Sequence, residues 1–180
     1  MKKNNPLYLY GAVLIFAGIF LLFAPYFEIR TIQLTLGITL VIGAILGFGK
    51  ALSRFKKQVE FSYHEIHALA MMVYGFTVLL FASTLETLIY VSTFLMFFYS
   101  FSEIIFCSWL FNLGRKVVYK IVFVRIILGL AVGIGTLLIM QYNTETNISS
   151  LYGFGVLFII IGINILLYLP VMKPKELTAV

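Results

Sequence analysis

Long apolar runs, separated by short polar segments, dominate the hydrophobic pattern of the chain. A helix needs roughly 20 apolar residues to cross the hydrocarbon core of a membrane. Six stretches approach or exceed this length, with expected bounds of 7–26, 31–48, 64–82, 85–111, 117–142 and 150–169. In the third stretch the apolar run itself starts only at Ala68. Because the runs are continuous rather than alternating, the pattern favours transmembrane helices over a transmembrane barrel.

The composition supports a membrane protein and excludes two other classes. Hydrophobic residues make up 62% of the 180 residues and charged residues only 11%. A soluble domain carries about 45–50% apolar and about 25% charged residues, and a disordered chain is still less hydrophobic. The single cysteine, Cys107, excludes an intramolecular disulfide and a Cys-rich metal site. We therefore expect one all-α integral membrane domain over 1–180, a polytopic bundle of six transmembrane helices.

Basic residues are distributed unevenly between the two sides of this expected bundle. The formal net charge is +6, with 13 Lys and Arg. Arg30 flanks one side and Arg125 lies inside the fifth span. The other eleven flank the side that carries both termini: Lys2, Lys3, Lys50, Arg54, Lys56, Lys57, Arg115, Lys116, Lys120, Lys173 and Lys175. Since basic residues beside short loops stay in the cytoplasm, both termini are predicted to be cytoplasmic. The positive charge indicates topology, and no nucleic-acid partner is expected.

A weak internal repeat runs through the chain. Gly18–Pro25, Phe76–Ser83 and Gly135–Tyr142 align at offsets of 58 and then 59 residues. The even-numbered spans align at offsets of 59 and 60 through Ile42–Ala44, Phe101–Glu103 and Ile161–Ile163. Two apolar helices also align by chance, but a constant period in both sets favours a repeat. The sequence therefore predicts three pseudo-repeated helical hairpins of the same orientation.

One family has a similar repeat. The segment Gly11–Pro25, with its spaced glycines and final proline, is followed by the Leu/Ile-rich segment Leu36–Leu46. This pattern resembles the short repeat of the HdeD-like (DUF308) membrane proteins. The third hairpin resembles it through its spaced glycines, Gly133, Gly135, Gly153, Gly155 and Gly162. The middle hairpin departs from it, because its spans hold only Gly75 and many Phe and Tyr residues. The resemblance implies a bacterial inner-membrane protein associated with acid stress, and it brings no catalytic residues.

Two pairs of glycines have the spacing that allows close helix packing. Gly43 and Gly47, and likewise Gly129 and Gly133, are four residues apart and share a helix face. Such faces allow backbones to approach closely in lipid. We expect them to pack within the chain, with a homo-oligomer contact as the alternative. The aromatic-rich fourth span is expected to face lipid, with a surface for a protein partner or hydrophobic ligand as the alternative.

The segment 50–67 is predicted to be a cytoplasmic loop with an amphipathic helix that lies on lipid head groups. Glu60, His64 and His67 stand at positions i, i+4 and i+7 of a helix within it. This spacing could present all three to a metal ion, or make the two histidines a pH-sensing pair. Ordinary interfacial histidines are the simpler interpretation. We predict no metal site and no cofactor.

Glu103 and Arg125, which lie deep within the fourth and fifth expected spans, are predicted to form an intramembrane ion pair. In an antiparallel hairpin centred near Gly114, residues whose numbers sum to about 228 lie level, as these two do. A lone charge at the bilayer centre costs about 2.5–3.5 kcal/mol, which favours pairing. Tyr99, one turn before Glu103, is expected to donate a hydrogen bond to it. The alternative is that Arg125 extends to the interface and Glu103 is protonated. A structural role is favoured over a proton relay.

These observations predict a non-enzymatic, multi-pass protein of the bacterial inner membrane, linked by the resemblance to acid or envelope stress. The chain has no nucleophile–base pair, phosphate-binding loop or nucleotide fingerprint. Two other functions stay open: a transporter or channel for protons or a small solute, and a structural subunit of a larger membrane complex. The expected partners are the lipid bilayer and either a second copy or a subunit of such a complex.

Overall fold

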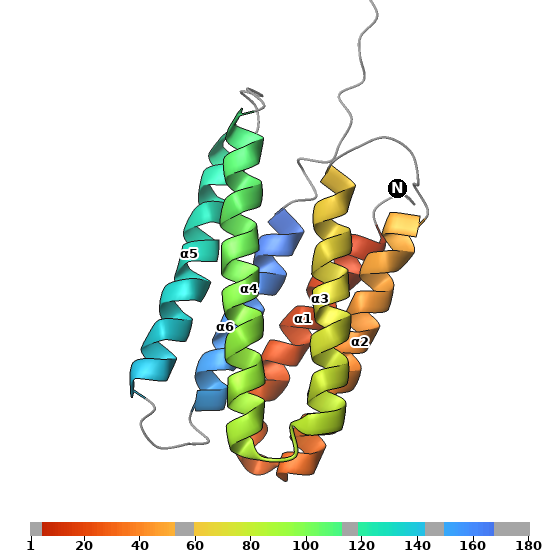
Figure 1. The fold of residues 1–180 in the computed structure, drawn as a ribbon, viewed down its shortest axis with the longest axis vertical. Helices are drawn as coiled ribbons and strands as arrows, with labels where there is room; N and C mark the ends of the chain where they lie inside the picture. The colour runs from red at the N-terminus through yellow and green to blue at the C-terminus, as the bar shows by residue number, and fades with distance from the viewer. Residues whose placement is uncertain (1–4, 53–59, 113–118, 143–149, 168–180) are drawn as a thin grey trace, which may run out of the picture.

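The computed structural model describes residues 5–52, 60–112, 119–142 and 150–167. Within these residues the chain is all-α, as the sequence predicts, with six helices and one short 3-10 turn, η1 (Ala24–Tyr26). The helices, shown in Figure 1, are α1 (Asn5–Leu22), α2 (Ile29–Leu52), α3 (Glu60–Phe81), α4 (Leu85–Asn112), α5 (Tyr119–Tyr142) and α6 (Ser150–Leu167).

Three helix ends differ from the predicted bounds by four residues each. The first helix was expected to reach Tyr26 but ends at Leu22, because Pro25 lies in the first turn of η1 and has no N–H for an α-helical bond. Helix α2 continues to Leu52 and α3 already begins at Glu60, so the connection between them is shorter than the predicted loop 50–67. The amphipathic helix expected in that loop falls mainly on 53–59, which lie outside the described residues.

Four of the helices are long and apolar enough to cross a membrane. Their qualifying stretches are Ile29–Phe48, Leu85–Trp109, Tyr119–Gln141 and Ser150–Leu167. The described apolar stretches of α1 and α3, Tyr8–Leu22 and Ile66–Phe81, are shorter than 18 residues. Large apolar side chains also cover the outside of the bundle, including Leu80, Phe94 and Ile105. Apolar surface of this extent is what a bilayer covers, and the chain therefore has the character of a multi-pass membrane protein.

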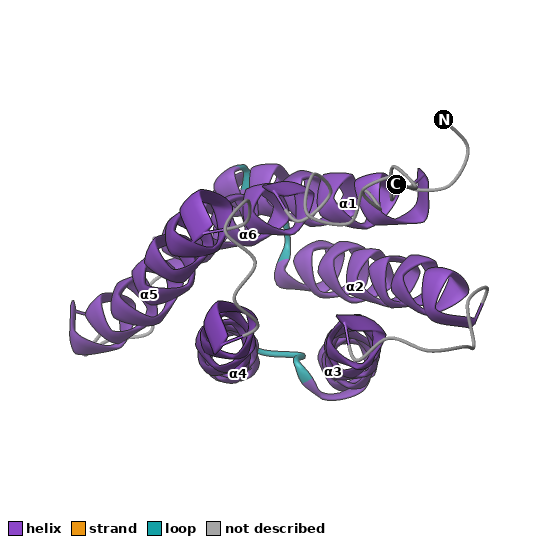
Figure 2. Cartoon of the chain, turned by 90° about the horizontal axis from the view of Figure 1, so that it is seen from above, coloured by secondary structure: helices purple, strands orange, loops and turns teal. Residues whose placement is uncertain are grey.

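The six helices form a ring in chain order (Figure 2). Each helix packs on the next, and α6 packs on α1 to close the ring. The most extensive contacts join α2 to α3, α4 to α5 and α6 to α1. The contacts within the three hairpins, α1–α2, α3–α4 and α5–α6, are smaller. Even-numbered helices therefore pack most closely on the odd-numbered helix that follows them around the ring.

Glycines bring two of these three pairs into backbone contact. A Cβ atom on Gly18 of α1 would lie 2.5 Å from the carbonyl oxygen of Gly155 on α6. One on Gly11 would lie 3.1 Å from the carbonyl oxygen of Gly162. On the other side of the ring, a Cβ on Gly37 of α2 would lie 3.1 Å from the carbonyl oxygen of Gly75 on α3. Close backbone approach of this kind is the usual way in which membrane helices pack.

The four glycines singled out by their spacing all pack within the chain. A Cβ on Gly47 would lie 2.9 Å from the Cβ of Ala68 on α3, whereas one on Gly43 would meet Tyr10 of α1 at an ordinary 3.5 Å. Gly43 and Gly47 therefore face two different neighbouring helices. Gly129 and Gly133 of α5 both face α4.

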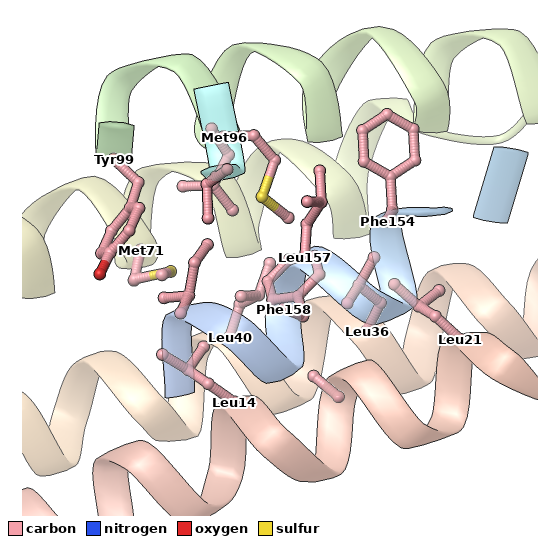
Figure 3. Close-up of a cluster of buried hydrophobic side chains, with 14 of the residues drawn as sticks. Leu14, Leu21, Leu36, Leu40, Met71, Met96, Tyr99, Phe154, Leu157 and Phe158 are labelled. Carbon is pink, nitrogen blue, oxygen red and sulfur yellow. The ribbon is translucent and has the colours of Figure 1, made fainter. Parts of the chain in front are cut away.

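The centre of the bundle is apolar in the half that contains the α3–α4 turn. Figure 3 shows this half, where side chains from four helices meet: Leu14, Leu21, Leu36, Leu40, Met96, Phe154, Leu157 and Phe158. We call these eight residues the apolar plug. Tyr99 lies at one end of the plug and carries the hydroxyl group seen in the same view. The other half of the bundle has a different interior, described below.

Substitution of Gly18 by alanine tests the close contact between α1 and α6. The added methyl group would meet the carbonyl oxygen of Gly155, so the helices must separate, and overpacking of this kind costs about 1–3 kcal/mol. The matched control is Gly43→Ala, whose methyl group finds ordinary contacts and gains helix propensity. We expect thermal unfolding in detergent to show a lower midpoint for Gly18→Ala and an unchanged or higher one for Gly43→Ala. Equal midpoints would contradict the packing described here.

Candidate functional site

The structure brings Glu103 of α4 and Arg125 of α5 together in a bidentate ion pair. The Arg125 Nε atom donates to Glu103 Oε1 at 2.7 Å, and Nη2 donates to Oε2 at 2.9 Å. Both side chains are inside the bundle, with 1% of Arg125 and 0% of Glu103 exposed. Two parallel N–H···O bonds fix the relative orientation of the two groups as well as their distance. The charges thus neutralise each other where water has no access.

The pair forms in a different register from the expected one. Gly129, not Arg125, lies level with Glu103, since a Cβ on Gly129 would be 3.1 Å from the Glu103 Cγ atom. One turn further along, Gly133 lies against Ser100, and the Ser100 hydroxyl donates to the Gly129 carbonyl oxygen at 2.8 Å. Arg125 is four residues before Gly129, about 6 Å along the helix axis. Its long side chain spans this offset, which a short basic group could not do.

The pair also lies off the middle of the bundle. Arg125 is six residues after the start of α5 at Tyr119, or about 9 Å. Glu103 is nine residues before the end of α4 at Asn112, or about 13 Å, in a helix about 42 Å long. Both therefore belong to the half that contains the α4–α5 connection, opposite the apolar plug.

Two further side chains of α4 contact the ion pair. The Cys107 thiol, one turn after Glu103, donates to Glu103 Oε1 at 3.3 Å. The ring of Phe106 lies 5.7 Å from the Arg125 Cζ atom, within the range of a cation–π interaction. In the sequence, only their i, i+4 spacing connects Cys107 with Glu103.

Tyr99 does not take its expected partner. Its hydroxyl oxygen accepts a hydrogen bond from Nδ2 of Asn164 on α6, at 2.5 Å. The Tyr99 ring extends from α4 into the bundle beside Met71 (Figure 3), while the Glu103 side chain turns toward α5. Residues four apart on a helix differ by about 40° in direction, and here that difference sends the two side chains to different neighbours. The predicted bond from Tyr99 to Glu103 is therefore wrong.

His67 lies inside the bundle, not at the interface expected from the sequence. Its Nε2 atom is 2.7 Å from the Ser102 hydroxyl oxygen, and its ring lies edge-on to that of Tyr99 at 5.2 Å. Because the Ser102 hydroxyl donates to the Tyr99 carbonyl oxygen at 3.0 Å, the histidine supplies the hydrogen of the first bond from Nε2. The His64 and Glu60 side chains lie outside the described residues. The residues described include no group of three metal-ligating side chains.

These buried polar residues form one assembly, which we call the polar cluster. It consists of His67, Tyr99, Ser102, Glu103, Cys107, Arg125 and Asn164, and it draws on α3, α4, α5 and α6. The His67 ring lies 5.2 Å from the Tyr99 ring, and Ser102 bonds to both residues. The sequence analysis missed Ser102 and Asn164. A signal for Asn164 was present, because it is the one amide side chain in the otherwise apolar last span.

The aromatic residues of α4 divide between the inside and the outside of the bundle. Tyr99 and Phe106 are buried, whereas Tyr90, Phe94 and Phe101 are exposed. The exposed rings lie on the outer surface, as expected for side chains in contact with lipid. Of the two buried rings, Tyr99 belongs to the polar cluster and Phe106 lies against Arg125.

Comparisons of this chain with protein-family models, with characterised proteins and with solved structures gave no match.

A double-mutant cycle tests whether Glu103 and Arg125 stabilise the fold as a unit. Removal of one partner leaves a buried charge or polar group without its counterpart, and such losses cost about 3–5 kcal/mol. We expect Glu103→Gln and Arg125→Leu each to lower the free energy of unfolding in detergent. The double variant should lose less than the two single losses together, since it leaves no uncompensated charge. Strictly additive losses would reject the coupling.

Proposed function

We propose that the chain crosses the bacterial inner membrane six times, with both termini in the cytoplasm. The antiparallel ring supports this proposal, because neighbouring helices run in opposite directions and α1 and α3 take part in this alternation together with the four helices that qualify as spans. The basic residues support the orientation, since eleven of the 13 flank the end of the bundle where α1 begins and α6 ends. With this orientation the polar cluster faces the cytoplasmic side and the apolar plug the outer side.

The function that we propose is that of a non-enzymatic, HdeD-like integral membrane protein that acts in acid or envelope stress. The repeat supports the family. Gly11 and Gly129 are 118 residues apart, twice 59, and their partners Gly162 and Glu103 are 59 apart. A rotation by one hairpin around the ring therefore places the α4–α5 contact onto the α6–α1 contact. A threefold repeat of hairpins requires this relation. The link to acid stress rests on the resemblance.

One observation carries the non-catalytic part of the proposal. The polar side chains of the cluster bond to one another across helices, and the opposite half of the bundle is filled by the apolar plug. Polar groups that satisfy each other inside a membrane protein hold helices together. An arrangement of this kind suits a stable membrane component better than an open substrate site.

A transporter of protons or of a small solute is the second candidate, and the ion pair favours it. Ionisable residues within a membrane are functional candidates by default, and Glu103 belongs to the same polar cluster as His67. Transport would require the apolar plug to open, since Leu21, Leu36 and Phe154 are fully buried there.

Reporter fusions test the proposed topology. Reporters that are active only in the cytoplasm or only outside it should be placed after Lys175 and within 143–149. We expect the fusion after Lys175 to be active with the cytoplasmic reporter and the one within 143–149 with the external reporter. A cytoplasmic location of 143–149 would contradict the six-span topology.

Two measurements separate the proposed functions. In liposomes with an internal pH dye and an imposed pH gradient, the leading proposal expects the purified protein to acidify the lumen no faster than empty liposomes. Faster acidification that Glu103→Gln abolishes and Gly43→Ala retains would favour the transporter instead. In cells, a strain without the protein should survive an acid challenge less well than the same strain with it restored. Equal survival would remove the proposed link to acid stress.

A further inference from the structure

Two buried polar atoms in the half of the bundle that holds the polar cluster have no hydrogen-bond partner among the described residues. They are the hydroxyl of Tyr10 on α1 and the Oδ1 atom of Asn164 on α6. Only 1% of Tyr10 and 0% of Asn164 is exposed. A buried donor and a buried acceptor without partners are unfavourable, and native structures satisfy such groups with protein or with ordered water.

The two side chains lie close to the same place in the fold. Antiparallel helices α1 and α6 approach each other at Gly11 and Gly162, so Tyr10 and Asn164 belong to the same level of this contact. The Tyr10 ring packs on Gly43 of α2, which places it on the inner side of α1. Asn164 is also linked directly to Tyr99, since its Nδ2 atom donates to the Tyr99 hydroxyl.

We propose that a bound water molecule connects Tyr10, Tyr99 and Asn164 at the centre of the bundle. A water oxygen accepts hydrogen bonds from the Tyr10 and Tyr99 hydroxyls, and one water hydrogen is donated to Asn164 Oδ1. The Tyr99 hydrogen is available because the bond from Asn164 uses only its oxygen. Buried waters typically make about three such bonds to groups that the protein leaves unsatisfied.

The choice of amide orientation at Asn164 does not remove the need for this ligand. If the amide were turned round, its oxygen would accept from Tyr99 and its nitrogen would become the group without a partner. A water molecule satisfies that arrangement as well, because it both donates and accepts. The Tyr10 hydroxyl needs an acceptor in either case.

This water extends the polar cluster from α5 to α1. Without it, the cluster ends at the Asn164–Tyr99 bond and includes no residue of α1. With it, hydrogen bonds connect α1, α4 and α6 beside the ion pair. The neighbouring Leu14 and Leu40 belong to the apolar plug and offer water no partner.

Hydroxyl-radical labelling tests the proposal on the full-length protein in lipid nanodiscs. X-ray radiolysis in water enriched in oxygen-18 labels side chains that lie beside bound water, even where bulk solvent has no access. We expect label on Tyr10 and Tyr99. The internal controls are Phe154 and Phe158, equally buried aromatic residues in the apolar plug. Labelling of the two tyrosines at only the level of these phenylalanines would overturn the proposal.

Two variants give independent readouts. Asn164→Leu removes the acceptor, so Tyr10 should lose its label while Phe154 and Phe158 do not change; retained label on Tyr10 would count against the site. Tyr10→Phe remains informative if Asn164→Leu fails to fold. Loss of a hydroxyl that is bound to water should lower the thermal midpoint by about 2–4 °C. Removal of an unsatisfied hydroxyl from a dry site would raise the midpoint or leave it unchanged, and either result would overturn the proposal.

Discussion

The exclusion of bulk water from the bundle interior is the constraint on which the rest of this structure depends. Inside a membrane a polar group must find its partner within the protein or in a bound water molecule. The guanidinium of Arg125 and the carboxylate of Glu103 meet this requirement for each other with two hydrogen bonds. The Asn164 Nδ2 atom bonds to the Tyr99 hydroxyl, and the His67 Nε2 atom bonds to the Ser102 hydroxyl. Both hydroxyl groups belong to α4. Helix α4 therefore supplies the partners for polar residues on three other helices.

Close helix contacts determine which polar groups can meet. The absence of a side chain on Gly129 makes room for the aliphatic part of Glu103, and the absence of one on Gly133 makes room for Ser100. This register places Arg125 about one turn from the level of Glu103, within reach of its long side chain. At the positions that the repeat relates to this contact, α1 and α6 have Gly11 and Gly162. One pair of helices has thus gained an ion pair where another has only close backbone packing.

The sequence was a good guide to the helices and a poorer guide to side-chain partners. Hydrophobic runs of this length leave little alternative to helices, and the two ionisable residues deep within them, Glu103 and Arg125, could be identified from the sequence. The bond expected between Tyr99 and Glu103 was wrong, because a difference of about 40° in direction depends on how the helices are rotated. The burial of His67 was missed for a related reason. Its position near the start of a short apolar run suggests an interface, and only the packing of α3 against α4 places it inside.

The two halves of the bundle differ in a way that bears on how such a protein works. Polar groups that contact each other directly hold helices in fixed positions, since movement of one helix would leave partners unsatisfied. The apolar plug has no such directional bonds, and its contacts depend on shape alone. Helix α4 has two smaller contacts, one with α3 and one with α6. The His67–Ser102 bond reinforces the contact with α3, and the Asn164–Tyr99 bond reinforces the contact with α6. The α4–α5 pair, with its ion pair inside, is therefore connected to the rest of the ring through these two bonds as well as through the packing of α5 on α6. Loss of the His67–Ser102 bond would weaken the ring at α3–α4, where the contact between neighbouring helices is smallest.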